Sequence, residues 1–370
     1  MTDNDLPLGI YIHFPYCRSR CPYCDFFRQI KPKDFDEEAF VTRYIEDMER
    51  FAPYCTARNV QSIFFGGGTP SILSPQSIEK ILNELSKRYQ IQKDAEITLE
   101  ANPNTYEQEK FLAFRKAGIN RLSLGVQALS AEGLKFLGRT HSLEEAHTAI
   151  AMGMKTFPKF SLDLIYARPE QTWQSWQHEI DIALKYGLKH ISLYELSIEE
   201  GTPFAKKKIK PMPDEKAAKL YEDTVAYLRS QGLERYEVSN FAADKTNQSQ
   251  HNLIYWQGGD YLGIGEGAHG RLHTKDGIFA IIDGKFAEKI TPQERAEELV
   301  IMGLRLREGI KKERFEKDCG LNFCKFFDIL SIKMLADLKL VCYSGDEIKL
   351  TDKGFLVLDR IISELLANRN

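Results

Sequence analysis

Three cysteines close to the start of the chain constrain its chemistry more than any other feature. Cys17, Cys21 and Cys24 have the spacing Cys-x3-Cys-x2-Cys and follow the short apolar run Leu8–Phe14, which is typical of a strand. Three thiolates on one loop can hold three corners of a [4Fe-4S] cluster. The fourth iron would then lack a protein ligand and could bind a small molecule.

Three other interpretations of these cysteines compete. A structural zinc site takes four ligands, and the fourth would have to be His13 or a distant residue. Cys21 and Cys24 alone resemble a glutaredoxin-type redox pair, but that leaves Cys17 unexplained in a chain too long for that fold. A disulfide framework is disfavoured because the total of seven cysteines is odd and the others are scattered at Cys55, Cys319, Cys324 and Cys342.

The composition is that of an ordinary globular chain, with 43% hydrophobic and 28% charged residues among 370. No apolar run approaches the roughly 20 residues that span a bilayer, and the first residues lack the pattern of a secretory signal. We therefore expect a cytoplasmic protein. The net charge of −3 provides no basic field for nucleic acid, and the local run Lys206–Lys210 is typical of a solvated loop.

Strand-type runs alternate with amphipathic helical stretches over about the first 240 residues, which predicts a parallel sheet. The predicted strands are 8–14, 60–65, 96–101, 121–126, 160–165 and 190–196. The predicted helices are 37–51, 75–89, 106–117, 143–152 and 172–186. Six such units indicate an α/β fold, a partial parallel (β/α)6 barrel whose site lies at the carboxyl ends of the strands.

The pattern changes after residue 240. We expect a barrel domain over 1–240, a connecting region over 241–290 with a hairpin-like segment at 272–290, and a C-terminal domain over 291–370. The last domain is helical with a predicted hairpin at 340–350, which is typical of a winged helix. Its interspersed acidic residues and the absence of a basic stripe argue against DNA binding.

A glycine-rich segment, Gly66–Pro70, follows the second predicted strand. Three consecutive glycines remove every side chain from the strand end, so that the backbone can approach a ligand closely. A plain tight turn would explain the glycines nearly as well. The segment is not a dinucleotide-binding fingerprint, because Gly-x-Gly-x-x-Gly leading into a helix is absent.

Polar side chains also close or interrupt other predicted strands. Glu100 ends the third strand, Gln127 follows the fourth and Asp163 lies within the fifth, while Arg139 supplies a cation twelve residues after Gln127. These groups could hold the hydroxyl, ammonium and carboxylate groups of a ligand. Glu100 could equally be a solvated strand-end residue, and Asp163 could be paired structurally inside the barrel.

Together the cysteine loop, the glycine-rich segment and the segments 122–127 and 163–166 resemble the radical S-adenosylmethionine (SAM) family, in its oxygen-independent coproporphyrinogen III oxidase branch. The resemblance implies that Cys17, Cys21 and Cys24 ligate a [4Fe-4S] cluster whose open iron binds SAM. It places Tyr11 and Tyr23 near the cluster and SAM. It also implies SAM contacts from Gly67, Gly68, Thr69, Glu100, Gln127, Arg139 and Asp163.

This branch contains true oxidases and haem chaperones of the HemW type, and three features favour the chaperones. The oxidases carry a further cysteine two residues after the third one, and this chain has Phe26 at that position. The chain begins only ten residues before Tyr11, whereas the oxidases carry a long N-terminal extension. The segment His251–Trp256 matches the HNxxYW motif that is associated with haem binding in the chaperones.

The resemblance therefore predicts haem contacts from His251, Tyr255 and Trp256. An imidazole can ligate haem iron, and the two aromatic side chains offer flat surface to a macrocycle. The alternative is that His251 forms local hydrogen bonds and the aromatic residues pack onto the barrel. His13, His269 and His273 remain alternative ligands.

We expect a radical SAM protein that binds haem as cargo and transfers it to an acceptor, such as a respiratory protein, with flavodoxin or ferredoxin as electron donor. Membrane association would occur only through a partner. The rival expectation is an enzyme, a coproporphyrinogen III dehydrogenase that removes hydrogen and carbon dioxide from two propionate side chains. A third is a binding protein whose cluster is only structural.

Overall fold

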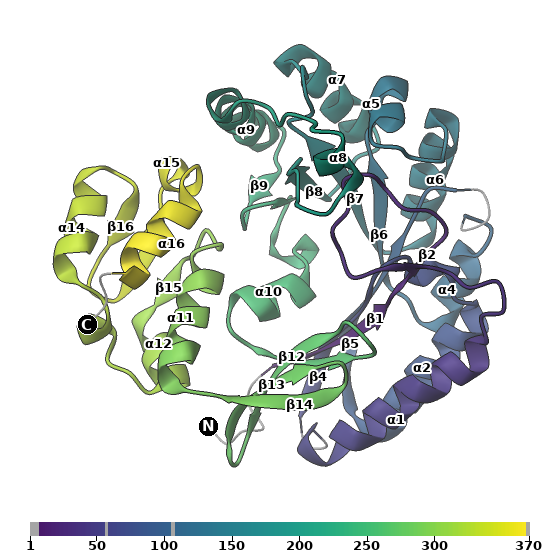
Figure 1. Ribbon diagram of the computed structural model, residues 1–370, viewed down its shortest axis with the longest axis horizontal. Helices are drawn as coiled ribbons and strands as arrows, with labels where there is room; N and C mark the ends of the chain where they lie inside the picture. Colours follow the sequence, from purple (N-terminus) through teal and green to yellow (C-terminus); the bar gives the residue numbers. More distant parts are fainter. Residues whose placement is uncertain (1–6, 56–57, 105–107, 368–370) are drawn as a thin grey trace.

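A curved sheet of twelve strands organises most of the molecule. The computed structural model describes residues 7–55, 58–104 and 108–367. The strands lie in the order β14-β13-β12-β11-β1-β4-β5-β6-β7-β8-β10-β9. Helices cover the convex side of this sheet, and the C-terminal part of the chain lies beside its open end (Figure 1).

Seven neighbouring strands of the sheet are parallel, from β11 through β1 and β4 to β8. Six of them are the strands that the sequence predicts, so the α/β fold with a partial parallel barrel is confirmed. Their bounds are β1 Leu8–Phe14, β4 Asn59–Gly67, β5 Gln90–Ala101, β6 Arg121–Gln127, β7 Lys159–Tyr166 and β8 His190–Glu195.

Several helices between these strands begin at a cap signal in the sequence. Ser74 caps α2 with Pro75 in the first position, and Ser142 and Glu145 form a capping box at α6. The start of the helix predicted at 106–117 lies outside the described residues. The helices are α1 Glu37–Cys55, α2 Pro75–Arg88, α4 Phe111–Ala117, α5 Ala131–Phe136, α6 Leu143–Thr156, α7 Trp173–Leu184 and α9 Asp214–Ser230.

The two faces of the sheet differ in polarity. On β1 the side chains of Leu8, Ile10 and Ile12 are fully buried in the core cluster that contains α1. The concave face is instead rich in small polar groups, such as Ser62 and Ser161, which are buried and hydrogen-bonded to histidines. Successive side chains of a strand point to opposite faces of the sheet, so the apolar set packs into the core and the polar set lines the face that carries the site.

The region 257–290 differs from the prediction. The hairpin-like segment predicted at 272–290 is present as the antiparallel meander β12-β13-β14, but the region also adds a seventh parallel strand, β11, beside β1. The glycines around Asp260–Ile264 weaken its strand signal, which explains why the sequence did not reveal it. The strands are β11 Asp260–Ile264, β12 His269–Thr274, β13 Gly277–Ile282 and β14 Lys285–Ile290.

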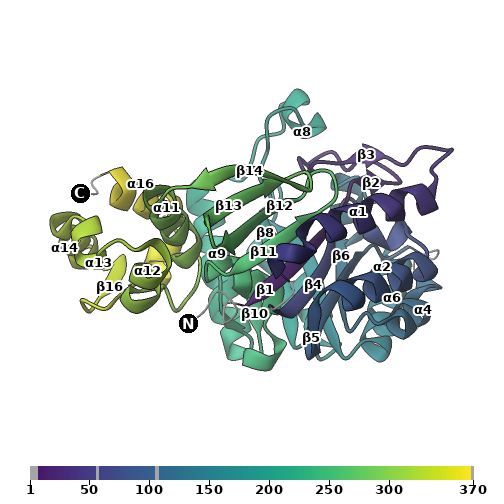
Figure 2. The ribbon, with the colours of Figure 1, turned by 90° about the horizontal axis from the view of Figure 1, so that it is seen from below.

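The opposite edge of the sheet carries short elements. β10 pairs with β8 antiparallel, and α8 projects from the body at the same end as the cysteine loop (Figure 2). The helix α10 lies on the concave side of the sheet (Figure 1), where it contacts β4. Their bounds are α8 Pro203–Lys206, β9 Glu234–Arg235, β10 Asn240–Ala242, η3 Lys245–Asn247 and α10 Gln250–Trp256.

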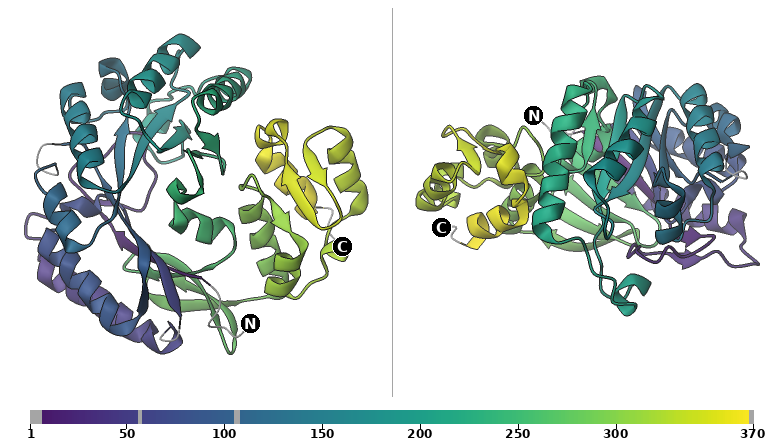
Figure 3. Two further views of the ribbon diagram at one scale, coloured as in Figure 1. Left: turned by 180° about the vertical axis from the view of Figure 1, so that it is seen from behind. Right: turned by 90° about the horizontal axis from the view of Figure 1, so that it is seen from above.

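The C-terminal part forms a separate helical lobe with its own three-stranded sheet, β15-β17-β16 (Figure 3). Ion pairs join it to the β9 edge, Arg235 with Asp352 at 2.7 Å and Arg307 with Glu234 at 2.6 Å. Its elements are α11 Pro292–Gly303, β15 Ile310–Lys311, α12 Lys312–Cys319, α13 Phe323–Phe326, α14 Ile329–Asp337, β16 Val341–Tyr343, β17 Glu347–Leu350, α15 Asp352–Phe355 and α16 Leu358–Ala367.

Helices followed by a small sheet agree with the predicted winged-helix-like architecture of this lobe. Within the described ranges, no helix combines the length and the low polarity that a membrane span requires.

Candidate functional site

The cysteine loop begins directly after β1 and is closed at its base by short strands. β2 Tyr16–Cys17 pairs parallel with β3 Gln29–Ile30, and the N–H of Lys31 donates to the carbonyl of Cys17 at 3.0 Å. A turn brings Cys24 N–H to 3.4 Å from the carbonyl of Cys21. The loop therefore holds all three cysteines over the carboxyl ends of the barrel strands.

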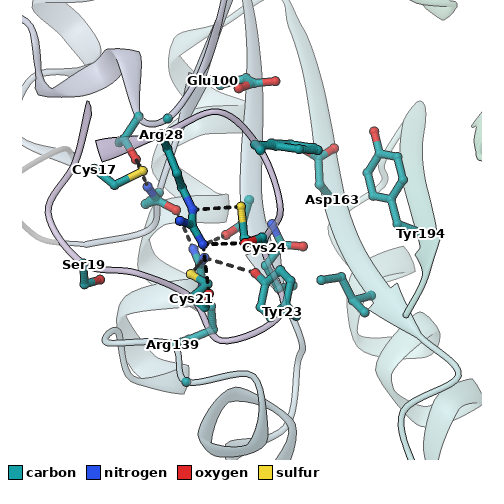
Figure 4. A pocket seen from close by; sticks show the side chains of 18 of the residues that line it. Cys17, Ser19, Cys21, Tyr23, Cys24, Arg28, Glu100, Arg139, Asp163 and Tyr194 are labelled. Carbon is teal, nitrogen blue, oxygen red and sulfur yellow. Dashed lines mark hydrogen bonds between the residues drawn. The ribbon is translucent and has the colours of Figure 1, made fainter. Parts of the chain in front are cut away.

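Each of the three sulfurs accepts a hydrogen bond. Thr69 Oγ1 donates to Cys17 Sγ at 3.5 Å, Arg28 Nε to Cys24 Sγ at 3.0 Å and Arg139 Nη1 to Cys21 Sγ at 3.3 Å. Figure 4 shows the side chain of Arg28 among the three cysteines. These donors fix the positions of the three sulfurs, while burial raises the pKa of the Cys17 thiol.

These sulfurs line a cavity of about 450 Å³. Its walls are the cysteine loop, the ends of β4 to β8 and the segment 138–141. A cavity of this size is large enough for a small-molecule cofactor. The site residues that line it are Cys17, Cys21, Cys24, Tyr23, Gly67, Gly68, Thr69, Glu100, Gln127, Arg139 and Asp163.

The glycines at the end of β4 let the cysteine loop approach the sheet. A Cβ on Gly68 would lie 2.6 Å from the carbonyl oxygen of Tyr16, and its N–H donates to the carbonyl of Phe14 at 2.7 Å. Gly67 has φ of 110° and donates its N–H to Glu100 Oε2 at 3.2 Å. Gly68 requires glycine because a side chain would push the loop off the strand, and Gly67 requires it because of its positive φ and because a Cβ would lie 2.6 Å from the ring of His13.

Two carboxyl groups lie together on the floor of the cavity. Burial, together with the nearby charge of Asp163, raises the pKa of Glu100 to about 8. Burial also raises the pKa of Asp163, although Ser123 Oγ donates to Asp163 Oδ2 at 2.7 Å and Ser161 Oγ to Oδ1 at 3.1 Å. Figure 4 shows Tyr194 beside Asp163. A cation bound here would relieve the repulsion between these two groups.

Gln127 adopts a strained backbone at the end of β6. Its φ is 73°, which is uncommon for a residue other than glycine, and the register with β7 shifts between Gly125 and Gln127. Its buried Oε1 has no protein hydrogen-bond partner. Strain and an unpaired acceptor at a cavity wall are typical of a binding site.

Arg139 connects several walls of the cavity. Besides Cys21, its Nη1 donates to Tyr23 Oη at 3.4 Å, and its Nη2 donates to the carbonyl of Gly125 at 2.8 Å and to Asn102 Oδ1. Asn102 in turn donates to Thr69 Oγ1 at 3.1 Å. The chain from Cys21 to Thr69 fixes the cysteine loop against β4, β5 and β6.

Sequence reasoning missed Arg28, Asn102 and His141 among the residues that line the cavity. Asn102 lies two residues beyond Glu100, so its place just after a strand end was a usable signal. Arg28 lies four residues after Cys24 on an irregular loop, and no local pattern marks it. Burial and the positive charge of Arg139 lower the pKa of His141 to about 4.

Tyr11 lies on the concave face of β1 and does not line the cavity. Its hydroxyl is 3.0 Å from His13 Nδ1, and its ring packs against Phe64 and His251. Tyr23, by contrast, lines the cavity and packs against Phe204 of α8, whose N–H donates to the carbonyl of Pro22 at 3.0 Å.

The residues of the HNxxYW segment lie on α10, away from the cavity. His251 is 1% exposed, its Nδ1 lies 2.7 Å from Ser62 Oγ and its Nε2 lies 2.6 Å from Tyr255 Oη. Burial lowers the pKa of His251 to about 3. The guanidinium of Arg305 lies 4.8 Å from the ring centre of Trp256. The local hydrogen bonding considered as an alternative is present, and the haem contact of these residues stays a prediction.

The other candidate histidines differ in exposure. His13 is buried, with its Nε2 3.1 Å from the carbonyl oxygen of Phe27. His273 Nδ1 lies 2.5 Å from Asp260 Oδ1. His269 is exposed at the start of β12.

The fold and the cysteine site are those of a radical SAM protein. Residues 11–183 match the family model described as the radical SAM superfamily, and residues 290–357 match the HemN C-terminal domain. The structure superimposes on coproporphyrinogen III oxidase (HemN) from Escherichia coli with a TM-score of 0.79 and 22% identity, covering 98% of this chain and 90% of that one.

Two curated relatives extend the likeness over nearly the whole chain. The chain is 35% identical to the heme chaperone HemW of Buchnera aphidicola, covering 85% of this chain and 87% of that protein. It is 34% identical to the mitochondrial radical S-adenosyl methionine domain-containing protein 1 of Bos taurus, covering 97% and 87% respectively. The chain therefore belongs to the HemN-like family of radical SAM proteins, in the group that contains HemW. Membership in this family implies a [4Fe-4S] cluster and SAM.

Proposed function

We propose that this protein is a haem chaperone of the HemW type, which holds a [4Fe-4S] cluster and SAM, binds haem and delivers it to an acceptor protein. The likeness to HemW-named proteins along most of the chain supports the chaperone function. The observation that carries the cofactor assignment is the meeting of three cysteine sulfurs, each with a donor, over one cavity with Glu100 and Asp163 at its floor.

The residues present fit both cofactors. Cys17, Cys21 and Cys24 would hold the cluster, which would leave one iron open to SAM and, when reduced, would supply the electron for SAM cleavage. The paired carboxyl groups favour the positive charges of the SAM ammonium and sulfonium. Gln127 offers an unpaired acceptor, and Arg139 offers a guanidinium that could pair with the SAM carboxylate.

Anaerobic reconstitution tests the cofactor part. Iron and sulfide analysis should give four of each per chain in a [4Fe-4S] protein, and a Cys17→Ala variant should lose the cluster. The matched control is Cys342→Ala, because Cys342 is exposed in the C-terminal lobe. Stoichiometric zinc without inorganic sulfide would contradict the assignment.

The chaperone part is tested by haemin titration and by transfer of bound haem to an apoprotein acceptor followed by absorbance. Saturable binding and transfer are expected. Incubation with coproporphyrinogen III, SAM and a reductant tests the rival function. Formation of protoporphyrinogen would show that the protein is an oxidase and not a chaperone. Formation of 5′-deoxyadenosine would exclude a purely structural cluster.

A further inference from the structure

Most histidines of this protein are already engaged inside the fold. All eight lie in the described part of the chain, and of these only His178 and His269 are exposed. His178 lies on α7, on the convex side of the sheet, whereas His269 lies at the start of β12. An imidazole must be accessible to ligate the iron of a haem that is later released.

His269 stands in a row with an apolar and a basic side chain. Its register partner on β13 is Ile282, and the partner of Ile282 on β14 is Lys285. Directly opposed residues of antiparallel strands project to the same face of a sheet. Ile282 is 38% exposed, and Lys285 is also exposed. The row therefore presents an imidazole, an aliphatic surface and an ammonium group side by side on three neighbouring strands.

The cysteine loop places two exposed aromatic rings next to this row. Phe26 is 66% and Phe27 is 47% exposed, although both belong to the type of side chain that is usually buried. A Cβ on Gly267 would lie only 2.3 Å from Cδ1 of Phe27, so Phe27 packs on the turn two residues before His269. Phe26 lines the mouth of the cysteine cavity.

The surface has the chemistry of haem. Haem combines an iron that takes an imidazole, a flat apolar macrocycle and two anionic propionates. Among the carboxylates nearby, Asp283 accepts the N–H of Gly267 at 2.6 Å, and Glu266 and Asp25 are exposed. Lys285 is the cation that stands opposite Ile282 and can pair with a propionate.

We propose that haem binds on the surface formed by Phe26, Phe27, His269, Ile282 and Lys285, with His269 as its axial ligand. This assignment rests on the proposed chaperone function and names its cargo site. It places the haem at the mouth of the cluster cavity, on the concave side of β12 and β13, and leaves His251 in its buried hydrogen bonds beneath.

Haemin titration of the reconstituted protein and of single variants tests the proposal. His269→Ala should weaken haem affinity at least tenfold and shift the Soret band, and added imidazole should restore the band of the original protein. His178→Ala is the matched control, since it removes the other exposed histidine, and it should change neither. Lys285→Glu should weaken binding about threefold, an effect that should disappear with a haem whose propionates are esterified.

The outcomes separate the two proposals. Absence of saturable haem binding by the original protein would overturn the chaperone function and this site together. Binding that is unchanged in His269→Ala but lost in His251→Ala would overturn only the site. Iron and sulfide contents equal to those of the original protein show that a variant has kept its fold and cluster.

Discussion

The guanidinium of Arg139 donates to the sulfur of Cys21 from 3.3 Å while its other amino group donates to the carbonyl of Gly125 at 2.8 Å. One planar side chain thus ties the cysteine loop to the end of β6. The position of the second cysteine is therefore set by the barrel as well as by the loop itself.

Arg139→Lys should test this relationship. A single ammonium group cannot reach Cys21, Asn102 and Gly125 with the geometry of the guanidinium fork. We expect a loss of about 2 kcal/mol of unfolding free energy, as for hydrogen bonds to charged groups, and weaker SAM binding. Urea unfolding and calorimetric titration with SAM measure these changes. Arg20→Lys, an exposed arginine on the same loop, is the control, and equal values for both variants would contradict the role of Arg139.

Arg28→Gln should destabilise the cysteine loop. Arg28 Nη2 donates to the carbonyls of Cys24 at 2.6 Å and Cys21 at 3.1 Å, and its Nε donates to Cys24 Sγ. Because these bonds order the turn that carries two ligands, the reconstituted variant should lose its cluster to a chelator about tenfold faster, which corresponds to roughly 1.4 kcal/mol. Absorbance near the cluster band follows the loss. A rate equal to that of the original protein would show that the loop is ordered without Arg28.

The parallel core of the fold was predictable because its signals are local. Leu8–Phe14 is recognisable as a strand from its composition, and its alternate residues do pack into one core. β11 was missed because its strand signal is short and its partner, β1, lies some 250 residues earlier in the chain. Sequence patterns of period two or 3.6 carry no information on such distant pairing.

Part of the candidate site was also predictable from the sequence, and part depended on tertiary packing. Glu100, Gln127 and Asp163 were predictable as a group, because parallel strands bring their carboxyl ends to one edge. The i, i+4 spacing of His251 and Tyr255 is compatible with one helix face, which they share on α10, but the spacing alone could not tell that this face turns inward. That orientation depends on where α10 packs, which is a property of the tertiary fold.

Glu100 should make the stability of the protein depend on pH. Its pKa is raised to about 8, so between its ordinary value and pH 8 the folded state keeps a proton that the unfolded chain has released. The unfolding free energy should therefore decrease as pH rises through this window, by up to about 1.4 kcal/mol per pH unit.

Glu100→Gln should flatten this pH dependence, since the neutral amide can still accept the N–H of Gly67. Urea unfolding at pH 5, 6.5 and 8 in the absence of SAM measures the difference. Glu288→Gln, at an exposed position on β14, should behave as the original protein. If the unfolding free energy of Glu100→Gln depends on pH as that of the original protein does, other groups, such as Asp163, cause the effect.

His273 should contribute stability with the same direction of pH dependence as Glu100, in a window that extends to higher pH. Burial alone would lower its pKa, but its hydrogen bonds to Asp260 and Asp318 raise the pKa to about 9. The charged imidazole stabilises the fold fully below the ordinary histidine pKa, and this contribution is lost as pH rises through 9. Asp260 also pairs with the buried Arg58, so the ion pairs join the meander to the end of α1.

His273→Gln should therefore lower the unfolding free energy by about 3 kcal/mol at pH 6 and by much less at pH 9.5. Thermal and urea unfolding at both pH values provide the comparison, and His178→Gln serves as the control at an exposed histidine. A cost that is equal at both pH values would mean that His273 acts by packing and not by charge. A histidine held by two carboxylates is not free to take iron. Haem affinity at pH 6 should therefore be the same in His273→Gln as in the original protein, whereas it should be at least tenfold weaker in His269→Ala.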